Sequence, residues 1–313
     1  MLKIYKTSAV EKKIKKVKKM TADCWIDLIV PTTDEIEKVA NRTGVEKELI
    51  MKLLDTEELP RVEQEENATL IVIDIPYLES EGEHKYKTYP LGIIITNNNY
   101  IITVSVKKTM LLNDFKRSRV KDFRTAKKTR FLIQILLKSA TSYLKALKEI
   151  NHDIEEKEKV LKKSTENKDL VELLEIEKTL VYFMTSLKAN DAVLEKLAKG
   201  IILPLYEGDL DLLEDTIIEN KQAIEMSGIY RDILSSVTDT YATIISNNLN
   251  IAMKFLAAAT IVLSIPTMIS SFLGMNVPLG AIGSISNAFI IILLIAVIVS
   301  CIVAILLKKK NML

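Results

Sequence analysis

The chain has 313 residues, of which 27% are charged, and its formal net charge is only +2. That balance argues against a nucleic-acid-binding surface as the main function. The two cysteines, Cys24 and Cys301, are isolated in the sequence and indicate no disulfide framework. The first residues hold no apolar run long enough for a signal peptide, so we expect the N-terminal part to stay where it is made.

Residues 1–106 predict a mixed α/β region. Residues 1–6 and the basic stretch 12–19 predict an edge hairpin whose lysines form a solvated strand face, although such a run can also touch anionic lipid. The run CWIDLIV at residues 24–30 is apolar and rich in β-branched residues, which predicts a buried strand. Further strands are expected at residues 68–76, 86–96 and 100–106.

Two short helices are expected after the buried strand. Thr32 and Glu35 have the spacing of a capping box, and Gly44 is a typical helix end. Residues 45–54 predict the second helix. Three asparagines at 97–99, which tolerate left-handed backbone, predict a hairpin turn, and residues 80–84 predict a polar turn.

No enzyme is predicted. The sequence has no Gly-rich phosphate loop, no HExxH and no CxxC pattern. His84 and His152 stand alone, which favours solvent-exposed or structural roles over metal ligation.

Residues 109–200 predict a helical region with two apolar stripes at three-four spacing. The stripes indicate an antiparallel helix pair that turns near residues 164–167. Asn190 lies in the second stripe, where a polar residue can set the register of a helix pair. The stripe residues are Leu132, Leu136, Tyr143, Leu147, Ile150 and Ile154, and then Leu173, Ile176, Leu180, Phe183, Leu187, Leu194 and Leu197.

Gly200 and Pro204 break this pair, and from about Asp209 the chain can run helical to Leu273. Such a helix is about 95 Å long, much longer than a membrane is thick, so most of it should form a stalk outside the bilayer. The acidic residues of its first turns suit the positive end of the helix dipole. They are Asp209, Asp211, Glu214 and Asp215.

Two membrane spans are expected at about 254–273 and 288–307, with an outer loop at 274–287. No charged residue or histidine occurs from Phe255 to Leu307. Lys254 precedes the first span, and Lys308, Lys309 and Lys310 follow the second. By the positive-inside rule both ends are then cytoplasmic and the uncharged loop is outside. The second span reads as a lipid-facing anchor.

The first span carries a stripe of small and polar residues on one helical face. One interpretation is tight helix packing through small residues, and the other is a wet pore wall. Met253 and Leu256 at the inner end would form a hydrophobic constriction. The predicted pore-lining residues are Asn250, Met253, Leu256, Ala257, Thr260, Ser264, Thr267 and Ser271.

The triplet Gly274, Met275 and Asn276 at the outer end of the first span resembles the signature of the CorA family of divalent-cation (magnesium/cobalt) channels. The stalk before it agrees with that family, and the resemblance is looser over residues 25–106. The agreeing stalk residues are Arg231, Asp232, Ile233, Asp239, Tyr241, Ser246, Asn247, Asn250, Met253 and Lys254.

The resemblance implies a funnel-shaped homopentamer in which each subunit gives its first span to a central channel. It implies a selectivity mouth at Gly274, Met275 and Asn276, where amide and carbonyl oxygens bind a hydrated ion. Leu273 stands where the family commonly has Tyr, the outer loop has no acid, and Ser264 stands where an apolar constriction is common.

A regulatory metal site is the weakest part of the resemblance. In the family, intracellular Mg²⁺ between an acid of the N-terminal domain and one at the start of the stalk holds the channel shut. Asp215 takes the stalk position, but its partner position is Lys52, which would form an ion pair instead of a metal site. Asp55, one turn after Lys52, could supply the N-terminal acid instead.

The sequence therefore predicts an α+β cytosolic domain with a mixed sheet, a long helical stalk and two C-terminal transmembrane helices. We divide it into an α/β domain (1–125), a helical hairpin and stalk (126–250) and a transmembrane region with a basic tail (251–313). The predicted partners are other copies of the chain and the lipid of the inner (plasma) membrane, with no nucleic acid.

The predicted function is import of hydrated Mg²⁺, or also Co²⁺ and Ni²⁺, driven by membrane potential and without any cofactor. One alternative is a Zn²⁺ transporter or exporter of the same superfamily. Another is a membrane-tethered coiled-coil adaptor.

Overall fold

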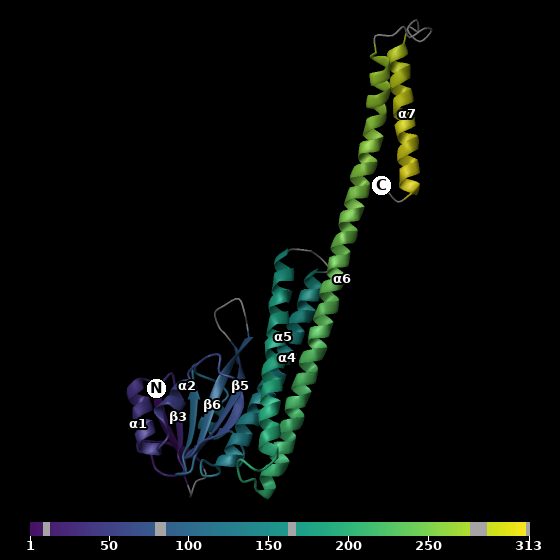
Figure 1. Cartoon of the computed structure of the whole chain (residues 1–313). Helices are drawn as coiled ribbons and strands as arrows, with labels where there is room; N and C mark the ends of the chain where they lie inside the picture. Colours follow the sequence, from purple (N-terminus) through teal and green to yellow (C-terminus); the bar gives the residue numbers. More distant parts are fainter. Residues whose placement is uncertain (9–12, 79–85, 162–166, 276–286, 311–313) are drawn as a thin grey trace. The chain divides into compact units, whose positions relative to one another are not determined.

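The computed structural model describes residues 1–8, 13–78, 86–161, 167–275 and 287–310 (Figure 1). The chain divides into two compact units, Met1–Val237 and Thr238–Leu313. Each unit is described separately below. The predicted turns at 80–84 and 164–167 lie mostly outside the described residues, and so does Asn276.

The first unit is built on a mixed sheet of seven strands in the order β2-β1-β3-β7-β6-β5-β4. Strands β3 and β7 are parallel, and every other neighbouring pair is antiparallel. The edge hairpin, the buried strand and the three later strands of the prediction are confirmed. The strands are β1 (Leu2–Thr7), β2 (Ile14–Val17), β3 (Trp25–Ile29), β4 (Arg61–Gln64), β5 (Ala68–Leu78), β6 (Tyr86–Thr96) and β7 (Ile101–Ser105).

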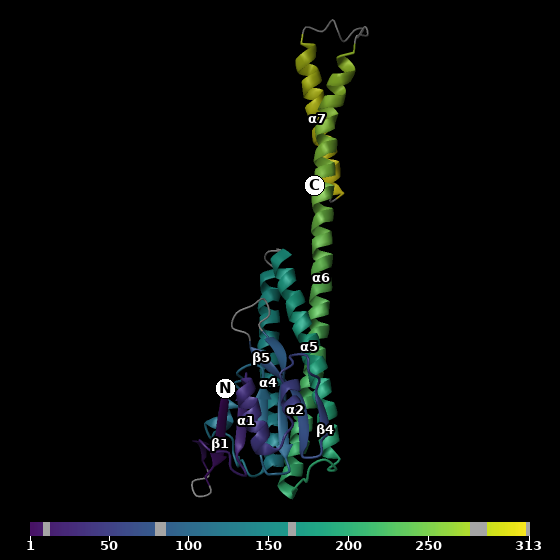
Figure 2. The same ribbon diagram turned by 60° about the vertical axis from the view of Figure 1, so that its left-hand side comes forward.

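Helices cover both faces of this sheet (Figures 1 and 2). Helices α1 (Thr33–Thr43) and α2 (Lys47–Lys52) pack on one face, around a core that includes Ile50 and Ile102. Helices α3 (Asn113–Lys116), α4 (Lys128–Leu161) and α5 (Asn167–Ala198) lie on the other, around a core that includes Trp25. The sheet is therefore buried on both sides, which explains why every residue of β3 and most of β6 are buried.

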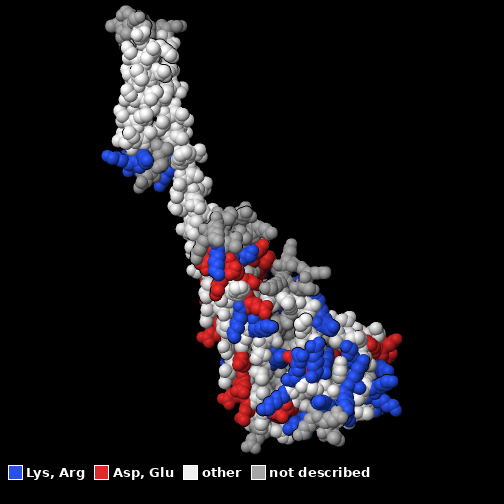
Figure 3. Space-filling model, turned by 180° about the vertical axis from the view of Figure 1, so that it is seen from behind, with Lys and Arg blue, Asp and Glu red and all other residues white. Residues whose placement is uncertain are grey.

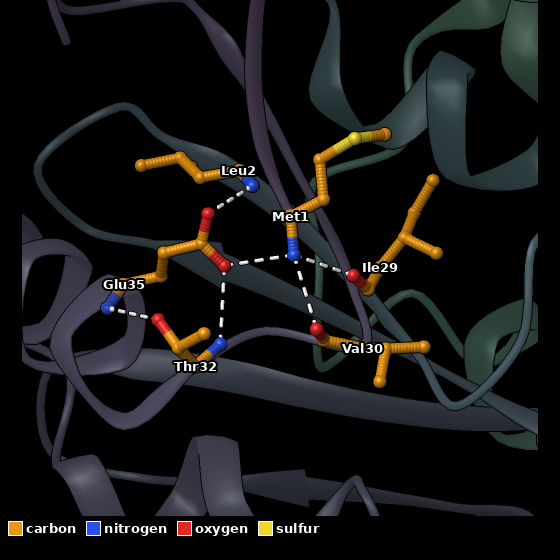
Figure 4. Close-up of polar contacts among 6 residues, drawn as sticks. All are labelled: Met1, Leu2, Ile29, Val30, Thr32 and Glu35. Carbon is orange, nitrogen blue, oxygen red and sulfur yellow. Dashed lines mark hydrogen bonds and ion pairs between the residues drawn. The ribbon is translucent and has the colours of Figure 1, made fainter.

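The predicted capping box begins α1 (Figure 4). The amide of Glu35 donates to the Thr32 hydroxyl, and the amide of Thr32 donates to the Glu35 carboxylate. The same carboxylate pairs with the amino group of Met1 at 2.7 Å and accepts the Leu2 amide at 2.8 Å. Burial alone would raise the pKa of Glu35, but these hydrogen bonds outweigh it and hold the pKa below its ordinary value. The Glu35 carboxylate therefore connects the first strand to the start of the first helix.

Helices α4 and α5 form the predicted antiparallel pair, and their stripes are buried except for Ile176, which is half-buried. The predicted helix from residue 109 is wrong at its start, because residues 117–127 are turns between α3 and α4. Ser118 and Asp122 there have positive φ angles of 55°, which no helix accommodates.

The position of Asn190 in the second stripe predicted that it sets the register between α4 and α5, but its side chain bonds to β5 instead. Its amide oxygen accepts the backbone N–H of Asp74 at 2.9 Å, and its amide nitrogen donates to the Asp74 carbonyl at 2.8 Å. Pairing of β4 with β5 ends at Val72, so Asp74 lies beyond the neighbouring strand. The side chain of Asn190 therefore takes the place of the missing strand: it satisfies the Asp74 N–H and shares the Asp74 carbonyl with the Ser139 hydroxyl.

Two long helices complete the chain, α6 (Glu207–Leu273) with 67 residues and α7 (Ala288–Lys309) with 22. Helix α6 contributes to both units. Its part in the first unit is joined to α5, because Asn220 donates to the Leu187 carbonyl at 3.1 Å and Ser227 to the Leu180 carbonyl at 3.0 Å. The predicted long helix from about Asp209 to Leu273 is confirmed.

Candidate functional site

The candidate site lies in the second unit, where the end of α6 and all of α7 lie side by side (Figures 1 and 2). Both helices are long and apolar enough to cross a membrane. All eight predicted pore-lining residues, from Asn250 to Ser271, are exposed in the single chain.

The opposite face of the same helix segment is the covered one. Ala258 is fully buried, and Val262, Ile265 and Ile269 are half-buried. At 100° per residue these positions centre about half a turn away from Thr260, Ser264 and Thr267. In α7 the buried residue is Ala296. The polar stripe of α6 is therefore turned away from the covered face and is free to meet other copies of the chain or solvent.

The hydroxyl groups of the stripe bond back to their own helix. Thr260 donates to the Leu256 carbonyl at 2.8 Å, Ser264 to the Thr260 carbonyl at 2.6 Å, and Thr267 to the Leu263 carbonyl at 3.3 Å. These bonds use the hydroxyl protons and leave the oxygen lone pairs on the exposed face. The stripe therefore offers a column of hydrogen-bond acceptors with no net charge.

A hollow of about 560 Å³ follows this column. It is lined by α6 alone, through four stripe residues and three larger apolar ones. The lining residues are Thr260, Leu263, Ser264, Thr267, Met268, Ser271 and Phe272.

The predicted selectivity mouth is described in part. Gly274 ends α6, and its amide donates to the Ser270 carbonyl at 3.0 Å. Met275 follows with 54% of its surface exposed. Asn276, the third residue of the triplet, lies outside the described residues, so the mouth stays a prediction.

The basic residues that flank the two spans are exposed, as Lys254, Lys308, Lys309 and Lys310 should be in a headgroup region. Figure 3 shows positive charge at one end of the uncharged pair of helices. Ser300 in α7 donates to the Ala296 carbonyl at 2.8 Å, so its hydroxyl is satisfied within its own helix.

The predicted regulatory residues lie in the first unit, and all are exposed in the single chain. Asp55 follows α2 and accepts the amide of Glu57 at 3.0 Å. Lys52 ends α2, and Asp215 lies in the third turn of α6. Within the described residues, no group of three or more His, Cys, Asp or Glu side chains is arranged to hold a metal ion. The regulatory site therefore remains a prediction about contacts between subunits.

One charged cluster was missed from the sequence. Asp27 in β3 is fully buried, and its carboxylate pairs with Lys116 of α3 at 2.6 Å and accepts the Thr103 hydroxyl at 3.0 Å. Thr103 in turn accepts the indole N–H of Trp25 at 2.9 Å. The only signal was one acid inside an apolar strand. These contacts connect α3 to the sheet in the core of the first unit.

Comparison with known proteins agrees with this architecture. The CorA-like Mg²⁺ transporter protein family matches residues 22–309. The cobalt/magnesium transport protein CorA of Methanocaldococcus jannaschii is 30% identical over 261 residues, which cover 80% of this chain and 79% of that protein. The protein of the same description from Thermotoga maritima is 22% identical over 257 residues, or 80% of this chain and 72% of that one.

The solved complete structure of the M. jannaschii CorA magnesium transporter matches with a TM-score of 0.88 and 25% identity, covering 100% of this chain and 99% of that one. The fold, the two apolar C-terminal helices and the match along nearly the whole sequence all lead to one assignment. The chain belongs to the CorA-like Mg²⁺ transporter family and is a membrane-embedded divalent-cation transporter, not an enzyme.

Proposed function

We propose that the chain forms a channel that passes hydrated Mg²⁺ into the cytoplasm along the stripe of α6. The observation that carries this proposal is the exposure of all eight stripe residues on the helix face opposite Val262, Ile265 and Ile269. A stripe of acceptor oxygens facing lipid would have no use, whereas the same stripe facing a water-filled axis would solvate a cation.

The absence of charge from Phe255 to Leu307 limits how the ion is held. Mg²⁺ dehydrates reluctantly and usually keeps several waters when bound to proteins. We propose that Asn276 side-chain oxygens and Gly274 carbonyls at the outer end accept hydrogen bonds from those waters. Such a site binds weakly enough to release the ion inward. Membrane potential supplies the driving force, about 4.6 kcal/mol per 100 mV for a double charge.

Two spans cannot enclose a pore, so the proposal requires several copies of the chain. We propose a homopentamer in which five copies of α6 surround the axis, with Met253 and Leu256 forming a constriction that opens by wetting. Support comes from the first unit as well, where one side of α6 exposes apolar residues that single chains rarely leave uncovered. They are Leu210, Ile218, Ile229 and Ile233.

The proposed orientation follows from Lys254 and Lys308–Lys310, which would lie at the cytoplasmic surface of the plasma membrane. The three-part division at residues 125 and 250 then separates a regulatory domain, a stalk and a pore. Asp215, with Asp55 or Lys52 of a neighbouring copy, is the proposed place where the closed state is held.

The test is Mg²⁺ uptake into proteoliposomes that hold an inside-negative potential. Wild type is compared with Asn276→Ala, and Asn287→Ala serves as the matched control, because Asn287 flanks the same loop and its side chain makes no cap hydrogen bond. We expect uptake that depends on the potential, is lost in Asn276→Ala and persists in Asn287→Ala.

No Mg²⁺ flux in the wild type would overturn the proposal. The same vesicles are then loaded with a Zn²⁺ indicator and given a proton gradient. Zn²⁺ flux under that condition would favour the zinc-transporting alternative, which the uncharged outer loop keeps open.

A further inference from the structure

A hollow of about 400 Å³ lies on the first unit, apart from the stripe and from the predicted regulatory residues. It is formed where the end of β5, the start of β6 and residues 108–111 meet the middle of α4. Its size is within the range of pockets that bind small molecules. The polar and rim residues that matter are Tyr77, Tyr86, Lys108, Met110, Lys145 and Glu149.

The described residues that line the hollow include two lysines and one acid, so their net charge is positive. Lys108 is exposed, and the Lys145 side chain is 80% exposed, with its amine 4.0 Å from Glu149. Glu149 is the single acid among the described lining residues, and its carboxylate accepts a short hydrogen bond from the Tyr86 hydroxyl. Burial, and then Glu149, raise the pKa of Tyr86, so its hydroxyl stays a neutral donor. Both lysines are exposed, and the ion pair of Lys145 with Glu149 is long, at 4.0 Å, so a ligand phosphate can compete for this amine.

A third amine, that of Lys107, lies next to Tyr77, which lines the hollow. Lys107 donates to the Tyr89 hydroxyl at 2.8 Å and lies 5.0 Å from the centre of the Tyr77 ring and 4.5 Å from that of Tyr89. These contacts hold its charge in one place. Among the described residues, the hollow thus has three ammonium groups in or beside it, against the carboxylate of Glu149 and that of Asp153, which also acts on Tyr86.

The rim of the hollow is apolar. Met110 is 84% exposed and Leu78 is 54% exposed, so both present large apolar surfaces to solvent. The segment that carries Met110 is held in place, because the buried Thr109 hydroxyl accepts the Leu111 amide at 3.1 Å. Methionine adapts its shape to varied ligands, and Tyr77 adds an aromatic wall.

We propose that this hollow binds a small organic phosphate, with the phosphate between Lys108 and Lys145 and its apolar or aromatic body against Met110, Leu78 and Tyr77. Lysine binds phosphate as a point charge, and several ammonium groups match a doubly charged monoester better than a carboxylate. The site is independent of the proposed pore, because none of its residues belongs to the second unit.

The test is calorimetric titration of the full chain in nanodiscs of uncharged lipid, without Mg²⁺. The probes are adenosine monophosphate and short-chain dihexanoyl phosphatidate, each beside its neutral counterpart, adenosine or dihexanoylglycerol, with inorganic phosphate as a third ligand. We expect one organic phosphate to bind with a Kd below about 1 mM and about tenfold more tightly than its neutral counterpart. Binding of the nucleotide indicates a soluble ligand, and binding of the phosphatidate indicates a lipid.

Variants then locate the site. Lys108→Ala and Lys145→Ala should each weaken binding about fivefold to tenfold, and Met110→Asp should weaken it too. Lys148→Ala is the matched control, an exposed lysine of the same helix outside the hollow. The proposal is overturned if neither organic phosphate binds better than its neutral counterpart, if inorganic phosphate binds as tightly, or if Lys148→Ala weakens binding as much as Lys145→Ala.

Discussion

Asp27 and Lys116 illustrate how single residues hold the first unit together. Asp27 has no exposed surface, and the Lys116 side chain is only 12% exposed. A buried pair of this kind contributes little net free energy compared with apolar residues, but removing one partner leaves an uncompensated charge. The amine also lies 5.6 Å from the Trp25 ring centre, so charge and core packing are coupled.

We therefore expect Lys116→Met to lower the free energy of unfolding by about 3 kcal/mol. Urea unfolding followed by the fluorescence of Trp25, the single tryptophan, measures this directly. The double variant Asp27→Asn with Lys116→Met removes both charges and should recover most of the loss. A loss below about 1 kcal/mol in the single variant would show that the pair is not buried in solution.

The carboxylate of Asp74 predicts how the stability of the fold changes with pH. This carboxylate accepts the Ser186 hydroxyl at 2.6 Å, but burial outweighs this bond and raises the pKa of Asp74. Above about pH 4, the ordinary pKa of Asp, the unfolded chain loses this proton while the folded chain keeps it. Asp74 therefore lowers stability as pH rises through the window between the two pKa values.

Asp74→Asn removes this penalty and keeps an acceptor for Ser186. From pH 4 to pH 7 the Tm of the variant should rise relative to wild type, by about 2–4 °C for each 1 kcal/mol of penalty removed. The exposed Asp122→Asn is the control and should follow the wild-type pH profile. A constant difference between Asp74→Asn and wild type across this range would contradict the assignment.

At the scale of elements, the packing of α2 on the sheet depends on one glycine. A Cβ atom on Gly92 of β6 would come within 2.5 to 2.9 Å of three atoms of the Leu53 side chain, which follows α2 and is buried. Glycine in the middle of a strand is itself unfavourable, and here it permits a close approach of helix and sheet.

Gly92→Ala should therefore lower the free energy of unfolding by about 1–3 kcal/mol through overpacking. Combining it with Leu53→Val should cost less than the sum of the two single changes, since the smaller side chain makes room. Gly208→Ala is the control, because a Cβ there meets only Arg130 at 3.6 Å. Additive losses in the double variant would mean that Leu53 is not the obstacle.

At the scale of the whole molecule, the apolar side of α6 in the first unit makes the oligomer testable. Ile229 is 49% exposed and Ile233 is 42% exposed, on the side that also carries Ile218. We expect Ile229→Asp to shift the protein from its oligomer toward smaller species, because a carboxylate would be buried between subunits without a partner.

Native mass spectrometry of the detergent-solubilised chain measures this shift. Val30→Asp is the matched control, since Val30 is 61% exposed and follows β3, outside α6. An unchanged oligomer in Ile229→Asp would show that this side of α6 is not a subunit contact. The predicted number of five subunits is read from the wild-type mass.

Features that depend on neighbours within a few turns could be predicted from the sequence. The two spans follow from local hydropathy, the start of α1 from the spacing of Thr32 and Glu35, and the stripe from Thr260 to Ser271 from helical periodicity. Family membership was predicted from a short local resemblance at residues 274–276 and the stalk before it, and the match over residues 22–309 confirms the family. The short strand β4 escaped prediction, since four residues with one buried side chain carry no clear alternation.

Contacts between residues far apart in the chain could not be predicted in this way. The parallel pairing of β3 with β7, the Asn190 bond to Asp74, the Asp27–Lys116 pair and the hollow beside Lys145 all join segments far apart in the chain. Such contacts depend on loop closure and on the packing of the whole unit, so no local pattern encodes them. The exposure of the polar stripe of α6 likewise depends on packing that no local pattern encodes. Its periodicity fixed which residues share a face, and the packing of the second unit decided that this face is left uncovered.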